Sequence, residues 1–278
     1  MTRSTLSLHF SRNGNGTSLR VERQDPPWRA IRAIPNPSGE ALVHLHNVSG
    51  GILDGDNLRL DINVAPRAQA QVATVGATRI HRGRTGGTGA QQETVIRVGS
   101  DALLEYLPDP VIPFARSRYK QRCEVRLADA AGLIWWETIS AGRIAHGERY
   151  SFEQLSSETV IYCPQTPLSA ERYSLLPNPG FIESPARMGP FLYSATMYVC
   201  RVDFALRWRN LEDELNTIAH SLSNTESLWG ASTLAQHGVI VRGMACRAYQ
   251  ISQGLHTLWR AAKESIWGRP ALFPRKLY

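Results

Sequence analysis

The amino-acid sequence predicts a mostly β fold: a single β-rich domain of many strands, with two α-helices toward the C-terminus. Apolar and polar residues alternate with period two in many short segments, which is typical of half-buried strands. Glycine, proline, asparagine and aspartate separate those segments, as they do where a chain turns between strands. Only two segments, both in the last quarter of the chain, show helical periodicity instead.

The clearest alternation occurs at 57–64, where four aliphatic residues share one face of the expected strand. The same pattern predicts strands at 119–127 and 200–208. Further strands are expected at 19–23, 29–34, 68–75, 93–98, 102–107, 133–140, 149–155, 159–163 and 238–246. The stretches 83–90 and 177–190 are expected to be exposed loops. Because the chain has no repeat of fixed period and no low-complexity linker, we expect one domain over residues 1–278.

Two segments carry apolar residues at helical spacing. In 211–222 they form one stripe, Asn210 can cap the start, and the acidic residues that follow complement the positive end of the helix. In 247–266 a longer stripe predicts a second helix, which Gly268 and Pro270 end.

Composition restricts the classes of partner. The net charge is +7, and lysine occurs only three times, so 28 of the 31 basic residues are arginine. They are spread evenly without a dense basic run, so we expect no nucleic acid partner. No apolar run approaches the roughly 20 residues that cross a bilayer, and no secretion signal is visible, so we expect a cytoplasmic protein without a membrane partner. The four cysteines lie far apart and are expected to be free thiols.

The stretch HNVSGGILDGD at 46–56 concentrates glycine and oxygen ligands before a strand. It lacks the G-x-G-x-x-G spacing of a dinucleotide site, and a strand follows where a helix should. The chain also has no Gly-Lys pair for a P-loop and no G-x-S-x-G, H-E-x-x-H or EF-hand motif. A structural turn explains the stretch, since glycine permits positive φ and aspartate bonds its own backbone.

A metal site is the alternative interpretation. His44 and His46 share one face of an expected strand about 7 Å apart, Asp54 and Asp56 share a face in an extended turn, and His81 follows a nearby strand. Histidine and carboxylate can hold nickel or zinc. Most isolated histidines are ordinary polar residues, however, so we expect no tight metal site; a weak path of oxygen and imidazole groups stays open.

Residues 46–83, HNVSGGILDGDNLRLDINVAPRAQAQVATVGATRIHRG, resemble the urease accessory protein family UreD, called UreH in some lineages. That family carries G-G-x-x-x-G-D and A-T-[KR] signatures, here Gly50-Gly51, Gly55-Asp56 and Ala77-Thr78-Arg79. The chain departs at His46-Asn47-Val48-Ser49, where many members have proline after the histidine, and at Ile80-His81, where many have tyrosine.

The resemblance continues in three later segments, so it covers about residues 40–278. The stretch 103–127 is similar to the leucine–proline turn and arginine-rich strand of the family, and the C-terminal LWRAAKESIWGRPALFPRKLY is similar to its closing helix and tail. The pattern E-x-x-x-x-G-R-x-x-x-G-E appears in 136–150 as Glu137, Gly142, Arg143, Gly147 and Glu148.

Membership would imply a non-catalytic urease maturation factor. Proteins of this family bind apo-urease and UreF, dock the GTPase UreG through UreF, and are thought to pass nickel through an internal water-filled passage. The resemblance therefore implies no stably bound cofactor, only nickel in transit. The absence of a Gly-Lys pair agrees with a separate GTPase, and a conduit requires weak ligands because the ion must also leave.

On this resemblance, residues of the family motifs become candidates for the passage. These candidates are Gly50, Gly51, Asp54, Gly55, Asp56, Thr78, Arg79, Glu137, Arg143 and Glu148, with His44, His46, Asp56 and His81 as weak transit ligands. For Arg143 and Glu148, an ion pair that holds the wall is the favoured alternative.

The helical stripes are expected to cover the β core, which is the usual role of one helix face. Trp229, Trp259 and Trp267 are candidates for partner docking, because large aromatic side chains concentrate binding energy at interfaces. A rival hypothesis from another class is a small β-rich hydrolase or ligand-binding module that uses the carboxylates of Asp56 and Glu137.

Overall fold

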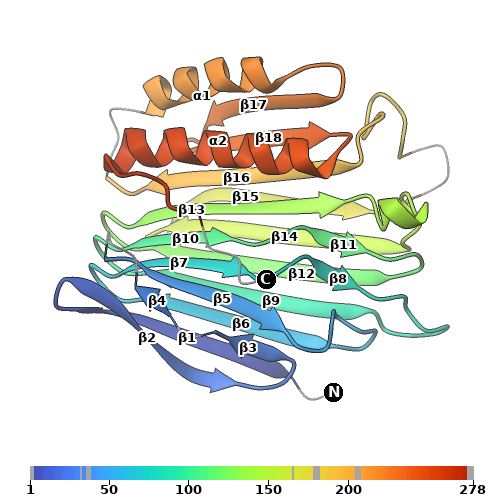
Figure 1. The fold of residues 1–278 in the computed structure, drawn as a ribbon, viewed down its shortest axis with the longest axis horizontal. Coiled ribbons are helices and arrows are strands. Elements are labelled where there is room, and N and C mark those ends of the chain that lie inside the picture. The colour runs from blue at the N-terminus through green and yellow to red at the C-terminus, as the bar shows by residue number, and fades with distance from the viewer. Residues whose placement is uncertain are drawn as a thin grey trace.

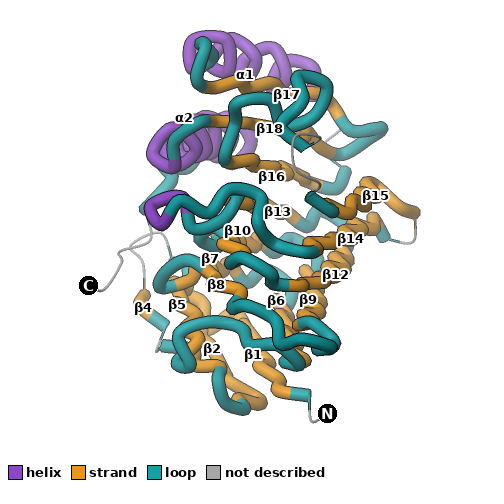
Figure 2. The backbone as a smooth tube through the Cα atoms, turned by 90° about the vertical axis from the view of Figure 1, so that its right-hand side faces the viewer, coloured by secondary structure: helices purple, strands orange, loops and turns teal. Residues whose placement is uncertain are grey.

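The computed structural model describes residues 3–31, 33–35, 39–164, 166–177, 182–203 and 208–273. Two sheets face each other across one core (Figures 1 and 2). The seven-stranded sheet contains β1 (Ser4–Asn13), β2 (Gly16–Gln24), β6 (Asn57–Val64), β9 (Ala90–Val98), β12 (Arg118–Leu127), β14 (Gln154–Cys163) and β15 (Thr166–Leu175). Its order is β15-β14-β12-β9-β6-β1-β2.

The second sheet has eleven strands. They are β3 (Trp28–Ala30), β4 (Ile34–Pro35), β5 (Ala41–Asn47), β7 (Gln69–Thr74), β8 (Thr78–Ile80), β10 (Leu103–Leu107), β11 (Val111–Pro113), β13 (Gly132–Ser140), β16 (Tyr193–Arg201), β17 (Ser227–Thr233) and β18 (Gly238–Ala245). The main order is β17-β18-β16-β13-β10-β7-β5-β3, with β4, β8 and β11 pairing beside it. The expected mostly β fold is confirmed.

The centre of the molecule is a parallel β-solenoid of four coils, although the sequence shows no repeat. Strands β5, β7, β10 and β13 are parallel neighbours in one sheet, and β6, β9, β12 and β14 are parallel neighbours in the other. The chain therefore crosses from one sheet to the other in every coil. Antiparallel pairings of β1 with β2, β14 with β15 and β13 with β16 complete the sheets around these coils.

At one end of the solenoid, three four-residue turns join consecutive coils and share one geometry. They lie between β6 and β7, β9 and β10, and β12 and β13. The third residue of each, Arg67, Asp101 and Ala130, has a positive φ of 63°, 58° and 56°. At the opposite end, which faces the reader in Figure 2, the connections 48–56, 81–89, 114–117 and 141–153 differ in length.

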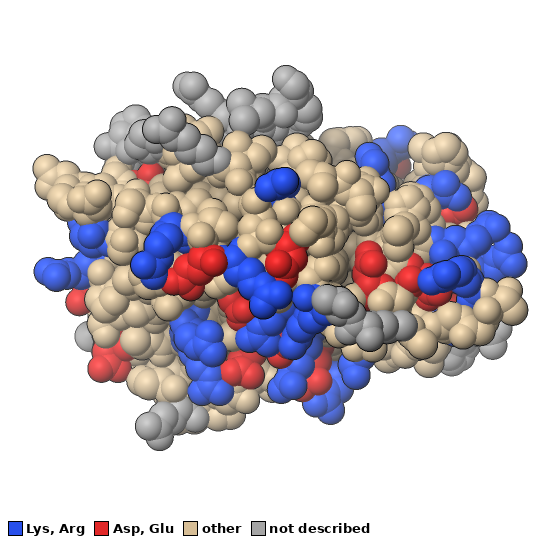
Figure 3. All heavy atoms as spheres, turned by 90° about the horizontal axis from the view of Figure 1, so that it is seen from below, with Lys and Arg blue, Asp and Glu red and all other residues tan. Residues whose placement is uncertain are grey.

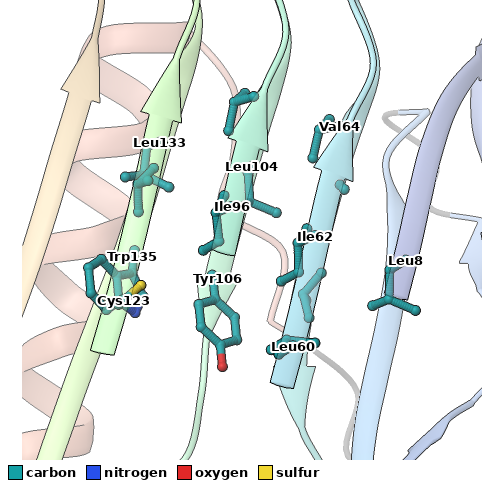
Figure 4. Close-up of a cluster of buried hydrophobic side chains, with 14 of the residues drawn as sticks. Leu8, Leu60, Ile62, Val64, Ile96, Leu104, Tyr106, Cys123, Leu133 and Trp135 are labelled. Carbon is teal, nitrogen blue, oxygen red and sulfur yellow. The ribbon is translucent and has the colours of Figure 1, made fainter. Parts of the chain in front are cut away.

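Period-two alternation builds the core between the sheets. Leu60, Ile62 and Val64 of β6 are at most 1% exposed and lie with Leu104 and Leu133 of the opposite sheet (Figure 4). Complete burial of such an aliphatic side chain contributes roughly 2 kcal/mol of stability. The apolar face expected at 57–64 is therefore the inner face of the sandwich.

Helices α1 (Trp208–Leu222) and α2 (Ala248–Trp267) lie on the outer face of the eleven-stranded sheet (Figure 1). The buried residues of α1 are Trp208, Leu211, Leu215 and Ala219. Those of α2 include Ile251, Leu255, Leu258, Trp259, Ala262 and Ile266. Both apolar stripes therefore pack on the sheet, as expected, and Gly268 ends α2 with a φ of 61°. Among the described helices, none combines the length and apolar character needed to cross a membrane.

An ionic cluster lies buried beneath α2. Lys263 Nζ lies 2.8 Å from Glu40 Oε1 and 2.5 Å from Glu105 Oε1, and the Trp259 indole donates to Glu105 Oε2 at 2.6 Å. The three charged side chains are at most 2% exposed. Burial raises the pKa of Glu105 to about 7 although Lys263 opposes the shift. The two carboxylates raise the pKa of Lys263 against the effect of its own burial.

Two strand predictions are wrong in part. At 200–208, β16 ends at Arg201 and Trp208 already belongs to α1, while 204–207 lie outside the described residues. At 149–155, only the last two residues enter β14. Tyr150, at a φ of 48°, and Phe152 instead bury their rings in a small satellite cluster, so loop packing imitates strand alternation.

Smaller differences concern 29–34, Asn210 and 177–190. Strand β3 ends at Ala30, so 29–34 is not one strand. Asn210 lies inside α1 and does not cap it, because the helix already begins at Trp208. The stretch 177–190 is not wholly exposed: Ile182 is 6% exposed, and 178–181 lie outside the described residues. Strands β1, β11, β15 and β17, and all but the last two residues of β16, were not predicted.

Candidate functional site

A cavity of about 340 Å³ lies between the two sheets, where the coils turn at the variable end. Its wall includes inward-facing residues of β9, β12 and β13 and the corners that follow β5, β7 and β10. The motif stretches recognised in the sequence meet here. Gly50 and Gly51 of the first motif, Thr78 and Arg79 of the second, and Glu137 of the third all line the cavity.

Glu137 is the carboxyl group of the inner wall. Burial raises its pKa to about 7, and the negative charge of Glu171 adds to the shift, whereas a hydrogen bond from Gln121 opposes it. The Gln121 amide also donates to Ser157 Oγ at 3.0 Å, which fixes its orientation between two strands. Near neutral pH, the Glu137 carboxyl can therefore take up and release a proton.

Three neutral side chains share the cavity lining with Glu137. Tyr106, Tyr119 and Cys123 line the same wall, and burial raises the pKa of each of these side chains above its ordinary value. A protonated thiol is a weak metal ligand compared with a thiolate. Across the described ranges, no group of three or more His, Cys, Asp or Glu side chains could hold a metal ion. The lining thus provides two carboxylates, Glu137 and Asp109, among phenol and amide groups, and Asp109 already accepts a hydrogen bond from the Thr74 hydroxyl at 3.0 Å.

The double glycine brings the first motif turn against β8. A Cβ atom at Gly51 would lie 2.6 Å from His81 Nε2 and 2.7 Å from the Arg79 carbonyl oxygen, and the φ of Gly51 is 158°. The Asn47 side chain donates to the Gly51 carbonyl at 3.1 Å, and Ile52 forms a parallel bridge with Ile80. Only glycine at this position permits so close an approach.

The aspartates of the first motif bind backbone amides and do not line the cavity. Asp56 Oδ2 accepts from the Leu53 amide at 2.8 Å within the turn, in which Gly55 has a φ of 88°. Asp54, whose side chain is 6% exposed, accepts from the Gly89 amide at 2.8 Å and so holds the neighbouring 81–89 connection. Both carboxylates therefore organise the stacked turns.

Arg143 and Glu148 form an ion pair, the alternative that the sequence favoured. Arg143 Nε donates to Glu148 Oε2 at 2.9 Å, and the same oxygen accepts from the Ala115 amide at 3.0 Å. The hydrogen bond from Arg143 lowers the pKa of Glu148. The guanidinium also lies 4.3 Å from the Phe114 ring centroid. This pair joins the third and fourth coils outside the cavity lining.

The three candidate histidines, His44, His46 and His81, do not come together in one site. His44 and His46 share one face of β5, as strand alternation predicts, but His44 is 1% exposed whereas His46 is exposed and lines the cavity. His81 packs edge-on against Phe114 with ring centroids 5.0 Å apart. Of the three, only His46 is placed where a passing ion could contact it.

The three candidate tryptophans serve packing to different degrees. Trp259 is 0% exposed, so its ring is not available to a partner. Trp229 is partly buried and fits closely against Gly243 of β18 and Gly254 of α2, where a Cβ atom would lie 2.4 Å and 2.2 Å from its ring. Trp267 is partly buried over Gly132.

The sequence analysis did not identify the polar residues next to Glu137 that extend toward the edge of the sandwich. Tyr198 Oη donates to Glu171 Oε2 at 2.6 Å, and Arg242 Nη2 donates to Glu171 Oε1 at 3.2 Å. These groups lie toward the β15 and β18 side of the sandwich. A signal was present for Gln121, because this amide interrupts the apolar face of 119–127. No comparable pattern marked Glu171.

The fold and the cavity define a class of β-solenoid protein with an internal polar cavity, whose described residues include no cluster of three or more strong metal ligands. The family model described as UreD urease accessory protein matches residues 2–277. The chain therefore belongs to the UreD family of urease accessory proteins and acts in urease maturation.

Curated relatives named urease accessory protein UreD cover nearly the whole chain. The protein of Herpetosiphon aurantiacus is 38% identical over 275 residues, covering 98% of this chain and 96% of the relative. That of Photorhabdus laumondii is 32% identical, covering 95% of this chain and 82% of the relative. That of Haloarcula marismortui is 29% identical, with 98% and 89% covered.

Proposed function

We propose that this chain is a non-enzymatic scaffold that binds apo-urease and UreF, reaches the GTPase UreG through UreF, and lets nickel pass through its cavity. The observation that carries the proposal is the partly buried Glu137 carboxyl in a cavity, in a chain whose described residues hold no cluster of strong metal ligands. Four free cysteines agree with action in the reducing cytoplasm.

The ligand chemistry supports transit over storage. A hydrated Ni²⁺ ion that reaches Glu137 displaces the carboxyl proton and meets that carboxylate, the Gln121 amide and phenol groups, with Asp109 as the second carboxylate of the lining. Such oxygen ligands hold a divalent ion weakly, so it can move on. Glu171, hydrogen-bonded by Tyr198 and Arg242, offers the next carboxylate on the way out.

The rival hydrolase receives no support from the placement of its carboxylates. Glu137 lines the cavity, whereas Asp56 is hydrogen-bonded to the Leu53 amide and does not line it. The two carboxylates therefore do not share a site in which one could act as acid and the other as base.

The test is urease activation under limiting nickel with Glu137→Gln. We expect at least a tenfold fall in urease activity and nickel content, with UreF capture unchanged, because the amide keeps the shape but cannot neutralise the ion. The matched control is Glu153→Gln, which changes an exposed carboxylate. Normal activation with Glu137→Gln at scarce nickel would show that the cavity is not the route.

A further inference from the structure

The variable end of the solenoid carries exposed arginines beside the cavity. Arg79, Arg82, Arg84 and Arg116, here called the arginine rim, are all exposed. Arg79 also lines the cavity. Figure 2 faces this end, where the connecting turns lie next to one another.

Backbone contacts bring the rim residues together from two successive coils. Strand β8 pairs with β11, with Arg79 opposite Ile112. The Gly83 amide donates to the Arg116 carbonyl at 3.0 Å, so Arg82 and Arg84 flank the residue bonded to Arg116. The positions are therefore set by the stacking of the coils.

Two carboxylates of the same turns, those of Asp54 and Glu148, are largely buried, and the exposed Glu153 pairs with Arg118 outside the rim. The side chains of Asp54 and Glu148 are only 6% and 16% exposed. Each accepts a backbone amide, from Gly89 and Ala115 respectively. By contrast, the side chain of Arg84 is 82% exposed although it lies 3.5 Å from Asp54. The acidic groups hold the turns, and the guanidinium groups face solvent.

Two apolar side chains stand on the same end. Val48 and Leu53, in the first motif turn, are 53% and 48% exposed. Exposed aliphatic groups beside arginines are the usual composition of a protein interface, in which arginine is enriched. On the face seen in Figure 3, by contrast, basic and acidic side chains are interspersed.

We infer that Val48, Leu53 and the arginine rim form a docking surface for an acidic face of a partner protein, which thereby closes over the cavity. The inference takes only one point from the proposed function, namely that a divalent metal ion passes through the cavity. Guanidinium groups at the entrance repel a free divalent cation, and partner carboxylates neutralise them. An ion would then enter or leave only while the partner is bound.

A binding experiment tests the surface with purified probes. The rim variant is R79Q/R82Q/R116Q, and the matched control is R12Q/R20Q/R97Q, which removes the same charge from exposed arginines elsewhere. Arg84 is kept because it contacts Asp54. Apo-urease, UreF and poly-L-glutamate are titrated separately at low and high salt, with a DNA duplex as a fourth probe.

We expect the rim variant to lose at least tenfold affinity for poly-L-glutamate and for apo-urease or UreF at low salt, while the control stays within twofold. Leu53→Glu, which adds a carboxylate to the surface, should weaken the same complex. Equal affinity of both triple variants for all protein probes would overturn the inference, as would tighter binding of the duplex than of any acidic probe. If Glu137→Gln abolishes urease activation but the rim variant weakens none of the complexes, the proposed passage is supported and the docking surface is refuted.

Discussion

Replacement of Lys263 by methionine removes the cation from the ionic cluster beneath α2. The ammonium group is 0% exposed and is shared by Glu40 and Glu105, which are 2% and 1% exposed. Breaking a buried pair by removing one partner leaves an uncompensated charge and costs roughly 3–5 kcal/mol. We therefore expect Lys263→Met to lower the free energy of unfolding by about this amount at pH 8.

The loss should depend on pH in a defined direction. Without the lysine, Glu105 can remain buried without a counter-charge only by taking up a proton, which is easier at pH 5. We expect a smaller loss at pH 5 than at pH 8. Adding Glu105→Gln should recover part of the stability at pH 8, since the amide still accepts from Trp259 and needs no counter-charge.

Urea denaturation followed by tryptophan fluorescence measures these free energies, with Lys120→Met, an exposed lysine, as the control. The control should shift the free energy by less than about 0.5 kcal/mol. A loss below about 1 kcal/mol for Lys263→Met at pH 8, or an equal loss at both pH values, would refute the assignment of a buried charge cluster.

Three further changes should be measurable by the same method or by proteolysis. Gly51→Ala should cost more than about 2 kcal/mol, because its Cβ meets the Arg79 carbonyl, whereas Gly50→Ala, at a φ of 79° but in open space, should cost about 1 kcal/mol. Asp54→Ala should speed protease cleavage within 81–89, and unchanged cleavage would contradict its role. The raised pKa of Glu137 means that the native state binds the carboxyl proton more tightly than the unfolded state does. This proton therefore stabilises the native state below about pH 4.5, and the stabilisation is lost as the pH rises through about 7. Glu137→Gln should make the free energy of unfolding depend less on pH over this range.

Alternation in single strands predicted most of the fold, but the solenoid could not be predicted in this way. A strand such as 57–64 buries the same face whether its neighbours are parallel or antiparallel, and the coils begin at uneven intervals. The error at Trp208 has a related cause: it lies three residues before Leu211 on the helical stripe and also continues the alternation of 200–208. Local periodicity therefore could not separate the two structures.

The cavity was predictable only through its motifs. Gly50, Gly51 and Glu137 were found because they resemble family signatures, and the structure places all three around one cavity. Glu171 comes from a strand without a motif, and Gln121 is not among the features that make 103–127 resemble the family, so only tertiary pairing brings the two residues near Glu137. The sequence likewise did not distinguish Asp54, which holds a loop, from a residue of the passage.

The two ends of the solenoid impose different tolerances on the chain. Three turns of equal length set the spacing between successive coils. An insertion in one of them would therefore displace the strands of a coil in both sheets. The connections at the other end already range from 114–117 to 141–153 without altering strand register. Because 81–89, 114–117 and 141–153 do not line the cavity, whereas 48–56 does, engineered segments should be accepted first in those three connections.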